Sequence, residues 1–261
     1  MTGALMEVAA VGHRYGHVQA LGHIDLEVAE GEFVAICGPS GCGKTTLLEI
    51  LSGLKSPTDG EVRLDGRRVD HPQPEIGVVF QEESTFPWRT VARNAAFGLE
   101  VLGVPRRERS ARVAEVLRTV GLADFADAYP AQLSGGMRQR VAIARTLVTR
   151  PRVVVMDEPF SALDEQTRLL LGGELLRIVG ETGATVLLVT HSIQEAALLA
   201  DRIIVLGARP ARVRDVIENP LPKPRDAGVL TTEAFAEVTR RVWSCLEDEA
   251  QRAYDAGAVA A

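Results

Sequence analysis

Two segments near the amino terminus alternate loosely between apolar and polar residues. They cover residues 5–11 and residues 24–28. Such alternation is typical of strands with one buried and one exposed face. Residues 61–69 show a similar pattern around Asp65-Gly66, a pair that favours a tight turn between two strands. We therefore predict an antiparallel β subdomain in this part of the chain.

Other segments are apolar without alternation, which indicates strands buried on both faces of a mostly parallel sheet. Their lengths are typical of strands and too short for helices. Together they predict an α/β core. The runs are residues 33–37, 76–80, 153–156, 185–189 and 203–206.

Helical spacing of apolar residues appears between these runs. Because residues 82–150 carry few strand signals and several helical ones, we expect a helical subdomain inserted into the core. The chain is therefore predicted to divide into a core of residues 1–81 and 151–207 that includes the antiparallel β subdomain, a helical subdomain of residues 82–150, and a tail of residues 208–261. The predicted helices are residues 46–54, 111–120, 137–148 and 165–179, with a final amphipathic helix at about 232–253.

Composition excludes several classes of protein. The length of 261 residues suits one large α/β domain or a core with an inserted lobe. The net charge of −6 argues against a nucleic-acid partner, which usually meets a basic face. Cys37, Cys42 and Cys245 form no CxxC pattern, which favours a reducing compartment. With no signal peptide evident and no apolar run near the roughly 20 residues that span a bilayer, we expect a cytoplasmic protein that serves a membrane only through a partner.

A phosphate-binding motif follows the first buried run and precedes a helical pattern. It fits GxxxxGK[ST] in the strand-to-helix context that this pattern requires. Backbone N–H groups of the glycines would surround the β-phosphate, Lys44 would reach the β- and γ-phosphates, and the Thr45 hydroxyl would bind Mg²⁺. The predicted nucleotide-binding residues are Gly38, Pro39, Ser40, Gly41, Cys42, Gly43, Lys44, Thr45 and Thr46.

Two acidic residues end the buried run 153–156. A carboxylate at Asp157 is costly to ionise in that position unless a cation accompanies it, which predicts a Mg²⁺ site. Glu158 is the candidate general base for the attacking water. Leu133, Ser134, Gly135 and Gly136 precede a predicted helix whose first-turn N–H groups form an anion site.

In this order, the three motifs resemble those of the ATP-binding-cassette (ABC) ATPases over residues 5–206. The resemblance implies a P-loop NTPase (RecA-like) core with residues 38–46 as Walker A, residues 153–158 as Walker B and residues 133–137 as the signature. Met137 stands where the family usually has Gln. Further residues implied by the resemblance are Gln81 as the Q-loop residue that contacts Mg²⁺ and water, Asp164 in the D-loop, His191 as the switch histidine and Tyr15 beside adenine.

The resemblance also implies partners. In the family, the signature of one subunit covers ATP bound to the other, so we expect a head-to-tail homodimer. Residues 79–94 and 206–213 are similar to the nitrate, sulfonate and taurine importer ATPases. This implies ATP-driven import of a small anion through a membrane-spanning permease and, indirectly, a solute-binding protein. Phe86 and Trp88 either dock that permease or pack inside the helical subdomain.

Two alternatives share the nucleotide motifs. One is the ATPase of an exporter or another ABC system, and the other is a soluble ABC ATPase without a membrane subunit. Single-chain translation factors of the family carry two cassettes, and DNA-repair members carry a long coiled coil; neither feature occurs here. Co-purification with a multi-spanning membrane protein distinguishes a transport role from a soluble one.

Overall fold

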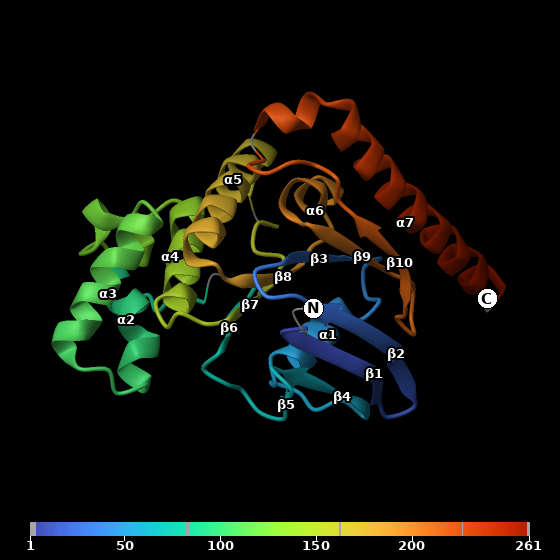
Figure 1. Ribbon diagram of the computed structural model, residues 1–261, viewed down its shortest axis with the longest axis horizontal. Coiled ribbons are helices and arrows are strands. Elements are labelled where there is room, and N and C mark those ends of the chain that lie inside the picture. Colours follow the sequence, from blue (N-terminus) through green and yellow to red (C-terminus); the bar gives the residue numbers. More distant parts are fainter. Residues whose placement is uncertain (1–3, 82–83, 162, 226, 260–261) are drawn as a thin grey trace. The chain divides into compact units, whose positions relative to one another are not determined.

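The computed structural model describes residues 4–81, 84–161, 163–225 and 227–259 (Figure 1). The chain divides into two compact units. One comprises Met1–Gln73 with Thr185–Ala261, and the other comprises Pro74–Ala184. The predicted helical subdomain, residues 82–150, belongs to the second unit, which also contains strands on either side of it.

The first unit contains the predicted antiparallel β subdomain. Its four-stranded sheet has the order β2-β1-β4-β5, and the register pairs Met6 with Val28 and Leu64. The predicted turn is confirmed, since Asp65 and Gly66 both have positive φ values, as a tight hairpin turn requires. The strands are β1 (Met6–Tyr15), β2 (Val18–Val28), β4 (Asp59–Leu64) and β5 (Arg67–Arg68).

The same unit contains a parallel group of strands with fully buried centres. β3 (Phe33–Cys37) lies between β8 (Thr185–Val189) and β9 (Arg202–Leu206) and runs parallel to both. All residues of β3 and β8 are buried, as their continuous apolar runs predict. β10 (Val213–Glu218) pairs antiparallel with β9. The sequence pattern does not predict β10, because only Ile217 in it is buried.

Three α-helices accompany these strands. α1 (Lys44–Leu51) begins within the phosphate-binding motif, at Lys44, and its apolar residues are buried. α7 (Glu233–Val259), preceded by the 3₁₀ turn η3 (Ala227–Thr231), confirms the predicted final helix and packs against α6, β9 and β10 (Figure 1). α6 (Ile193–Leu199) is not predicted, because most of this short helix is buried and it has no polar face that would reveal a helical period.

The second unit pairs β6 (Ile76–Val79) in parallel with β7 (Val153–Asp157). Its α-helices are α2 (Val91–Val101), α3 (Arg106–Thr119), α4 (Gly135–Leu147) and α5 (Glu165–Thr182), with 3₁₀ turns η1 (Ala123–Phe125) and η2 (Pro130–Gln132). α2 contacts both α3 and α4. The apolar pattern does not single out α2, because the polar Asn94 lies in its buried face. Among the helices that the structure describes, none combines the length and apolarity needed to cross a bilayer.

Candidate functional site

The loop between β3 and α1 depends on glycine at close contacts. Gly43 has φ +120°, and a Cβ there would lie 2.8 Å from the Leu21 side chain. A Cβ at Gly38 would lie 3.1 Å from the Leu206 carbonyl oxygen. Any side chain at these positions would displace the loop from β2 and β9. The glycines of the motif therefore serve the packing of this loop as well as its conformation.

Lys44 is only 7% exposed and lies across the same loop. Its Nζ donates hydrogen bonds to the carbonyl oxygens of Gly38 at 2.8 Å and Pro39 at 3.0 Å. These carbonyls carry no net charge, so they do not neutralise the ammonium. The N-terminal turn of α1 adds its own partial positive charge. The loop therefore fits the phosphate groups of a nucleotide.

Tyr15 lies beside the first turn of α1. The residue is 47% exposed, and its hydroxyl hydrogen-bonds the Thr46 hydroxyl at 3.2 Å and accepts from Lys55 Nζ at 2.5 Å. Lys55 also pairs with Glu49 at 2.6 Å. The hydrogen bond from Lys55 lowers the pKa of the Tyr15 phenol. The structure thus joins Tyr15 to the phosphate-binding segment, and it adds Lys55, which the sequence analysis does not identify because no local pattern links the two residues.

Cys42 is the one titratable group in the loop besides Lys44. It is buried, and this burial raises the pKa of its thiol. The neighbouring Cys37 is fully buried, which raises its pKa to about 12. Both thiols are therefore neutral near pH 7, and no thiolate in the loop would repel a phosphate.

His191 follows β8 in the same unit and is exposed. Hydrogen bonds hold the turn that carries it: the buried Thr190 hydroxyl donates to Glu195 Oε2 at 2.6 Å and accepts from the Ser192 N–H at 3.0 Å. Ser192 in turn caps α6 by accepting from the Glu195 N–H. The histidine is thus presented to solvent on an anchored turn.

In the second unit, residues predicted to bind Mg²⁺ or to act in catalysis lie at one edge of a strand pair. The register pairs Val79 with Met156, so Gln81 after β6 and Asp157 at the end of β7 share the same carboxyl-terminal edge. Asp157 is only 6% exposed, and Gln81 is exposed. Glu158 has φ +43°, an uncommon backbone conformation that turns the chain sharply after the strand.

Two of the predicted ligand-binding residues are helix N-caps. Ser134 Oγ accepts from the Met137 N–H at 3.3 Å at the start of α4. Asp164 accepts from the Thr167 N–H at 2.9 Å at the start of α5, and this bond holds the pKa of the Asp164 carboxyl below its usual range. Met137 takes part through its backbone N–H, so the missing Gln amide leaves this cap intact. Each residue therefore has a structural role in addition to the predicted contact with nucleotide.

No group of three or more His, Cys, Asp or Glu side chains that could form a metal centre occurs among the described residues. The residues predicted to bind Mg²⁺ are Thr45 in the first unit and Gln81 and Asp157 in the second, and they supply a hydroxyl, an amide oxygen and one carboxylate. Such a set fits Mg²⁺, which usually binds one or two carboxylates together with water and phosphate oxygens. It does not fit a metal held entirely by protein side chains.

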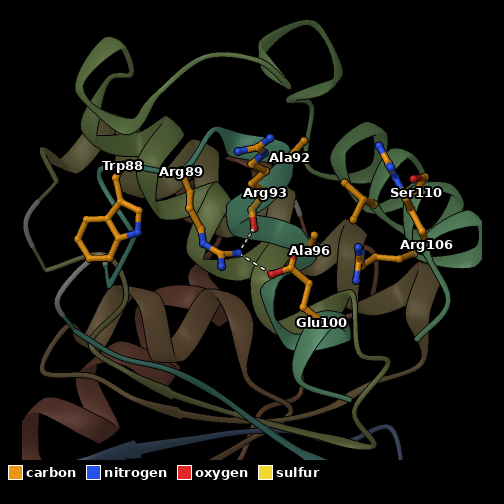
Figure 2. A pocket seen from close by; sticks show the side chains of 10 residues that line it. Trp88, Arg89, Ala92, Arg93, Ala96, Glu100, Arg106 and Ser110 are labelled. Atoms are coloured by element: carbon orange, nitrogen blue, oxygen red, sulfur yellow. Dashed lines mark hydrogen bonds and ion pairs between the residues drawn. The ribbon is translucent and has the colours of Figure 1, made fainter. Parts of the chain in front are cut away.

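The helical part of the second unit has a groove of about 660 Å³ that the sequence analysis does not predict (Figure 2). Trp88, 71% exposed, lies at this groove, whereas Phe86 is half-buried and meets Phe97 edge to face with 4.8 Å between ring centroids. The two aromatic residues therefore differ: Phe86 packs within the unit and Trp88 is available to a partner. The charged groups of the lining are Arg89, Arg93, Arg106, Arg109 and Glu100.

Known proteins share the sequence as well as the motifs. Residues 21–161 match the profile of the ABC transporter family, and they include the glycine-rich loop, the capped α4 start and the acidic end of β7. The chain belongs to the ABC transporter family. It is an ABC-type ATPase with the P-loop fold predicted above.

Individual relatives match over most of the chain, and two of them are named for the solute whose import they serve. An uncharacterized ABC transporter ATP-binding protein of Methanocaldococcus jannaschii is 52% identical over 89% of this chain and 86% of its own length. An aliphatic sulfonates import ATP-binding protein of Xanthomonas axonopodis is 49% identical over 87% of this chain and 90% of its own length. A taurine import ATP-binding protein of Rhizobium johnstonii is 49% identical over 77% of both.

A solved structure agrees with the fold. It is the dimeric post-hydrolysis state of an ATP-binding cassette bound to ADP and phosphate. It is 34% identical, covers 83% of this chain and 100% of its own, and has a TM-score of 0.71. A related ABC ATPase therefore hydrolyses ATP within a dimer of the same fold.

Proposed function

We propose that this ABC ATPase drives the import of a small anion such as nitrate, a sulfonate or taurine. The observation that carries this proposal is the identity of 49% to relatives whose names specify sulfonate and taurine import, over most of the chain. The permease and a solute-binding protein would complete the transporter. The chain would then work at the cytoplasmic face of the membrane and would not bind nucleic acid.

The nucleotide would lie against the loop of residues 38–46 with its adenine beside Tyr15. Lys44 would give up its hydrogen bonds to the Gly38 and Pro39 carbonyls and bind the nucleotide phosphates instead. This exchange is favourable because the phosphates are charged acceptors and the carbonyls are neutral ones. Mg²⁺ held by Thr45, Gln81 and Asp157 would neutralise phosphate charge. The short bond network around Tyr15 fixes the ring before the nucleotide arrives, which lowers the entropy cost of binding.

For hydrolysis, Glu158 would accept a proton from the attacking water, with Gln81 and His191 oriented toward that water and the γ-phosphate. A positioned general base contributes about 10²–10⁴-fold in rate. The left-handed conformation of Glu158 directs its side chain differently from that of Asp157, the preceding residue. The two neighbouring carboxylates can therefore take separate roles.

Two copies would form the working unit. The signature residues Ser134, Gly135 and Gly136 of one copy, together with Asp164 at the start of α5, would cover the triphosphate held by the other. ATP that binds the closed pair more tightly than the open one shifts the equilibrium toward closure. The helical subdomain, residues 82–150, would transmit that movement to the permease.

The groove of the helical region would receive the permease. Its four arginines and one glutamate give it a net positive charge, and Arg89 is already paired with Glu100 at 2.7 Å (Figure 2). The remaining arginines favour a partner segment with carboxylates, and Trp88 provides an exposed apolar anchor. A short helix with acidic residues and one apolar face has these properties.

The test is recovery of a multi-spanning membrane protein with the full-length chain from detergent-solubilised membranes of the source cells. Trp88→Ala should reduce this recovery, and Arg93→Glu should reduce it further. Trp243→Ala is the matched control, because Trp243 is 60% exposed on α7 and lies outside the groove. Recovery of the membrane protein equal to wild type in Trp88→Ala and Arg93→Glu would contradict the docking site. Failure of the wild type itself to recover any such protein would contradict the transport role.

A further inference from the structure

The loop between β9 and β10, residues 207–212, has no role in the site described above. It contains Arg209-Pro210 and is fastened to the backbone of β2. The Gly22 N–H donates to the Ala211 carbonyl at 2.8 Å, and the Ala211 N–H donates to the Ala20 carbonyl at 3.0 Å. The loop therefore has a fixed place beside the strand that Gly43 of the phosphate-binding loop also contacts.

From this place Arg209 reaches the phosphate-binding loop. Its guanidinium donates a hydrogen bond to the Gly41 carbonyl at 2.8 Å. The positive charge of Arg209 also affects the Cys42 thiol of this loop. Burial raises the pKa of the Cys42 thiol, while the positive charges of Lys44 and Arg209 oppose that rise. Arg209 is thus both a donor to this loop and a source of its positive potential.

The hydrogen bonds of the loop carbonyls show what Arg209 contributes. Lys44 binds the carbonyls of Gly38 and Pro39, and Arg209 binds the carbonyl of Gly41. A peptide carbonyl turned toward a phosphate would repel it, whereas the N–H groups of the loop attract it. When Lys44 turns to the phosphates it gives up its two carbonyls, but Arg209 takes no part in that exchange. The bond to Gly41 can therefore persist while nucleotide is bound.

We propose that Arg209 is a positioning residue for nucleotide binding, which holds the Gly41 carbonyl so that the loop keeps the conformation that binds the β-phosphate. This inference rests on the proposed role of the loop in binding the nucleotide phosphates. It assigns a function to the first residues of the tail, which follow β9 along the chain. Because the effect acts at the phosphate end, it concerns ATP and ADP and not AMP, which lacks a β-phosphate.

The experiment measures the dissociation constants of ATP, ADP and AMP for the full-length chain, by competition with a fluorescent nucleotide. Arg209→Ala should weaken ATP and ADP binding by about tenfold, since a solvent-exposed charged hydrogen bond contributes at the low end of its range. AMP binding should change less than about twofold, as for a surface substitution away from the bound groups. Arg209→Lys should recover most of the loss, because it retains a charged donor.

Arg212→Ala is the matched control. It removes the same charge from the same loop, and the Arg212 side chain lies against Gly22 of β2, whereas Arg209 donates to the Gly41 carbonyl. It should leave all three dissociation constants unchanged. Thermal melting of each variant checks that the fold is retained.

Three outcomes would overturn the inference. ATP and ADP affinities of Arg209→Ala equal to those of wild type would exclude the positioning role. An equal loss for AMP would mean that the adenine side is affected instead. An equal loss of ATP and ADP affinity in Arg212→Ala would mean that the effect comes from the positive charge of the loop and not from the hydrogen bond to Gly41. In each case wild-type ATP binding remains intact, whereas a wild type that binds no ATP would refute the proposed function itself.

Discussion

The Asn94 side chain holds the conformation of residues 86–90, the segment that leads into α2, through its hydrogen bonds. It is fully buried, with a relative exposure of 0%. The Phe86 N–H donates to its Oδ1 at 2.7 Å. Its Nδ2 donates to the carbonyls of Phe86 at 3.1 Å, Arg89 at 2.9 Å and Thr90 at 3.1 Å. One amide thus fastens both ends of the segment that presents Trp88.

Asn94→Ala removes all of these bonds. The amide nitrogen has only two hydrogens, so its three donor contacts amount to two full hydrogen bonds. With the accepted bond the total is three, each worth about 1 kcal/mol net. Phe86 and Thr90 each keep another backbone donor on their carbonyls, at 3.1 Å and 2.8 Å, which reduces the loss. We therefore expect the free energy of unfolding to fall by about 2–3 kcal/mol.

Urea unfolding of the full-length chain measures this change, and hydrogen exchange at residues 84–94 shows where it acts. The Phe86 amide should lose protection, because Asn94 is its acceptor. Ser110→Ala, an exposed substitution on α3 in the same unit, should stay within about 0.5 kcal/mol of wild type. A loss in Asn94→Ala as small as in this control, or unchanged protection of Phe86, would refute the reasoning. Asn94→Asp should be at least as destabilising, since it buries a charge and loses both donor hydrogens.

Three further predictions concern the nucleotide site. Glu158→Gln should bind ATP but hydrolyse it about 10²–10⁴-fold more slowly and remain dimeric; phosphate release and size-exclusion chromatography measure this, and a monomer at saturating ATP would argue against the shared site. Lys55→Met should raise the pKa of the Tyr15 phenol, which is lowered mainly by the Lys55 hydrogen bond; ultraviolet difference titration against Tyr15→Phe measures it, and an unchanged pKa would disprove the contact. The folded-state pKa of Asp164 lies below its ordinary value, so its helix cap stabilises the fold above the unfolded pKa, and this stabilisation is lost as pH falls through the folded pKa. The melting temperature of the wild type should therefore fall over this acid range by more than that of Asp164→Asn. An identical dependence of melting temperature on pH in the variant would count against the cap.

Local sequence was sufficient for the elements whose burial is uniform or strictly periodic. β3 and β8 are buried at every residue, and their continuous apolar runs indicate this without any knowledge of their neighbours. The phosphate-binding loop could also be predicted, because its glycines, lysine and helix start lie within residues 38–46 and interact mainly with one another.

Contacts between distant residues were decided by the tertiary structure. Arg209 and Gly41 are 168 residues apart, and no periodicity in either segment indicates that they meet. The same holds for Lys55 and Tyr15, which are 40 residues apart. Whether Trp88 is exposed likewise depends on the packing of its surroundings. Periodicity reveals which face of an element is buried, but which segments come together depends on the packing of the whole chain.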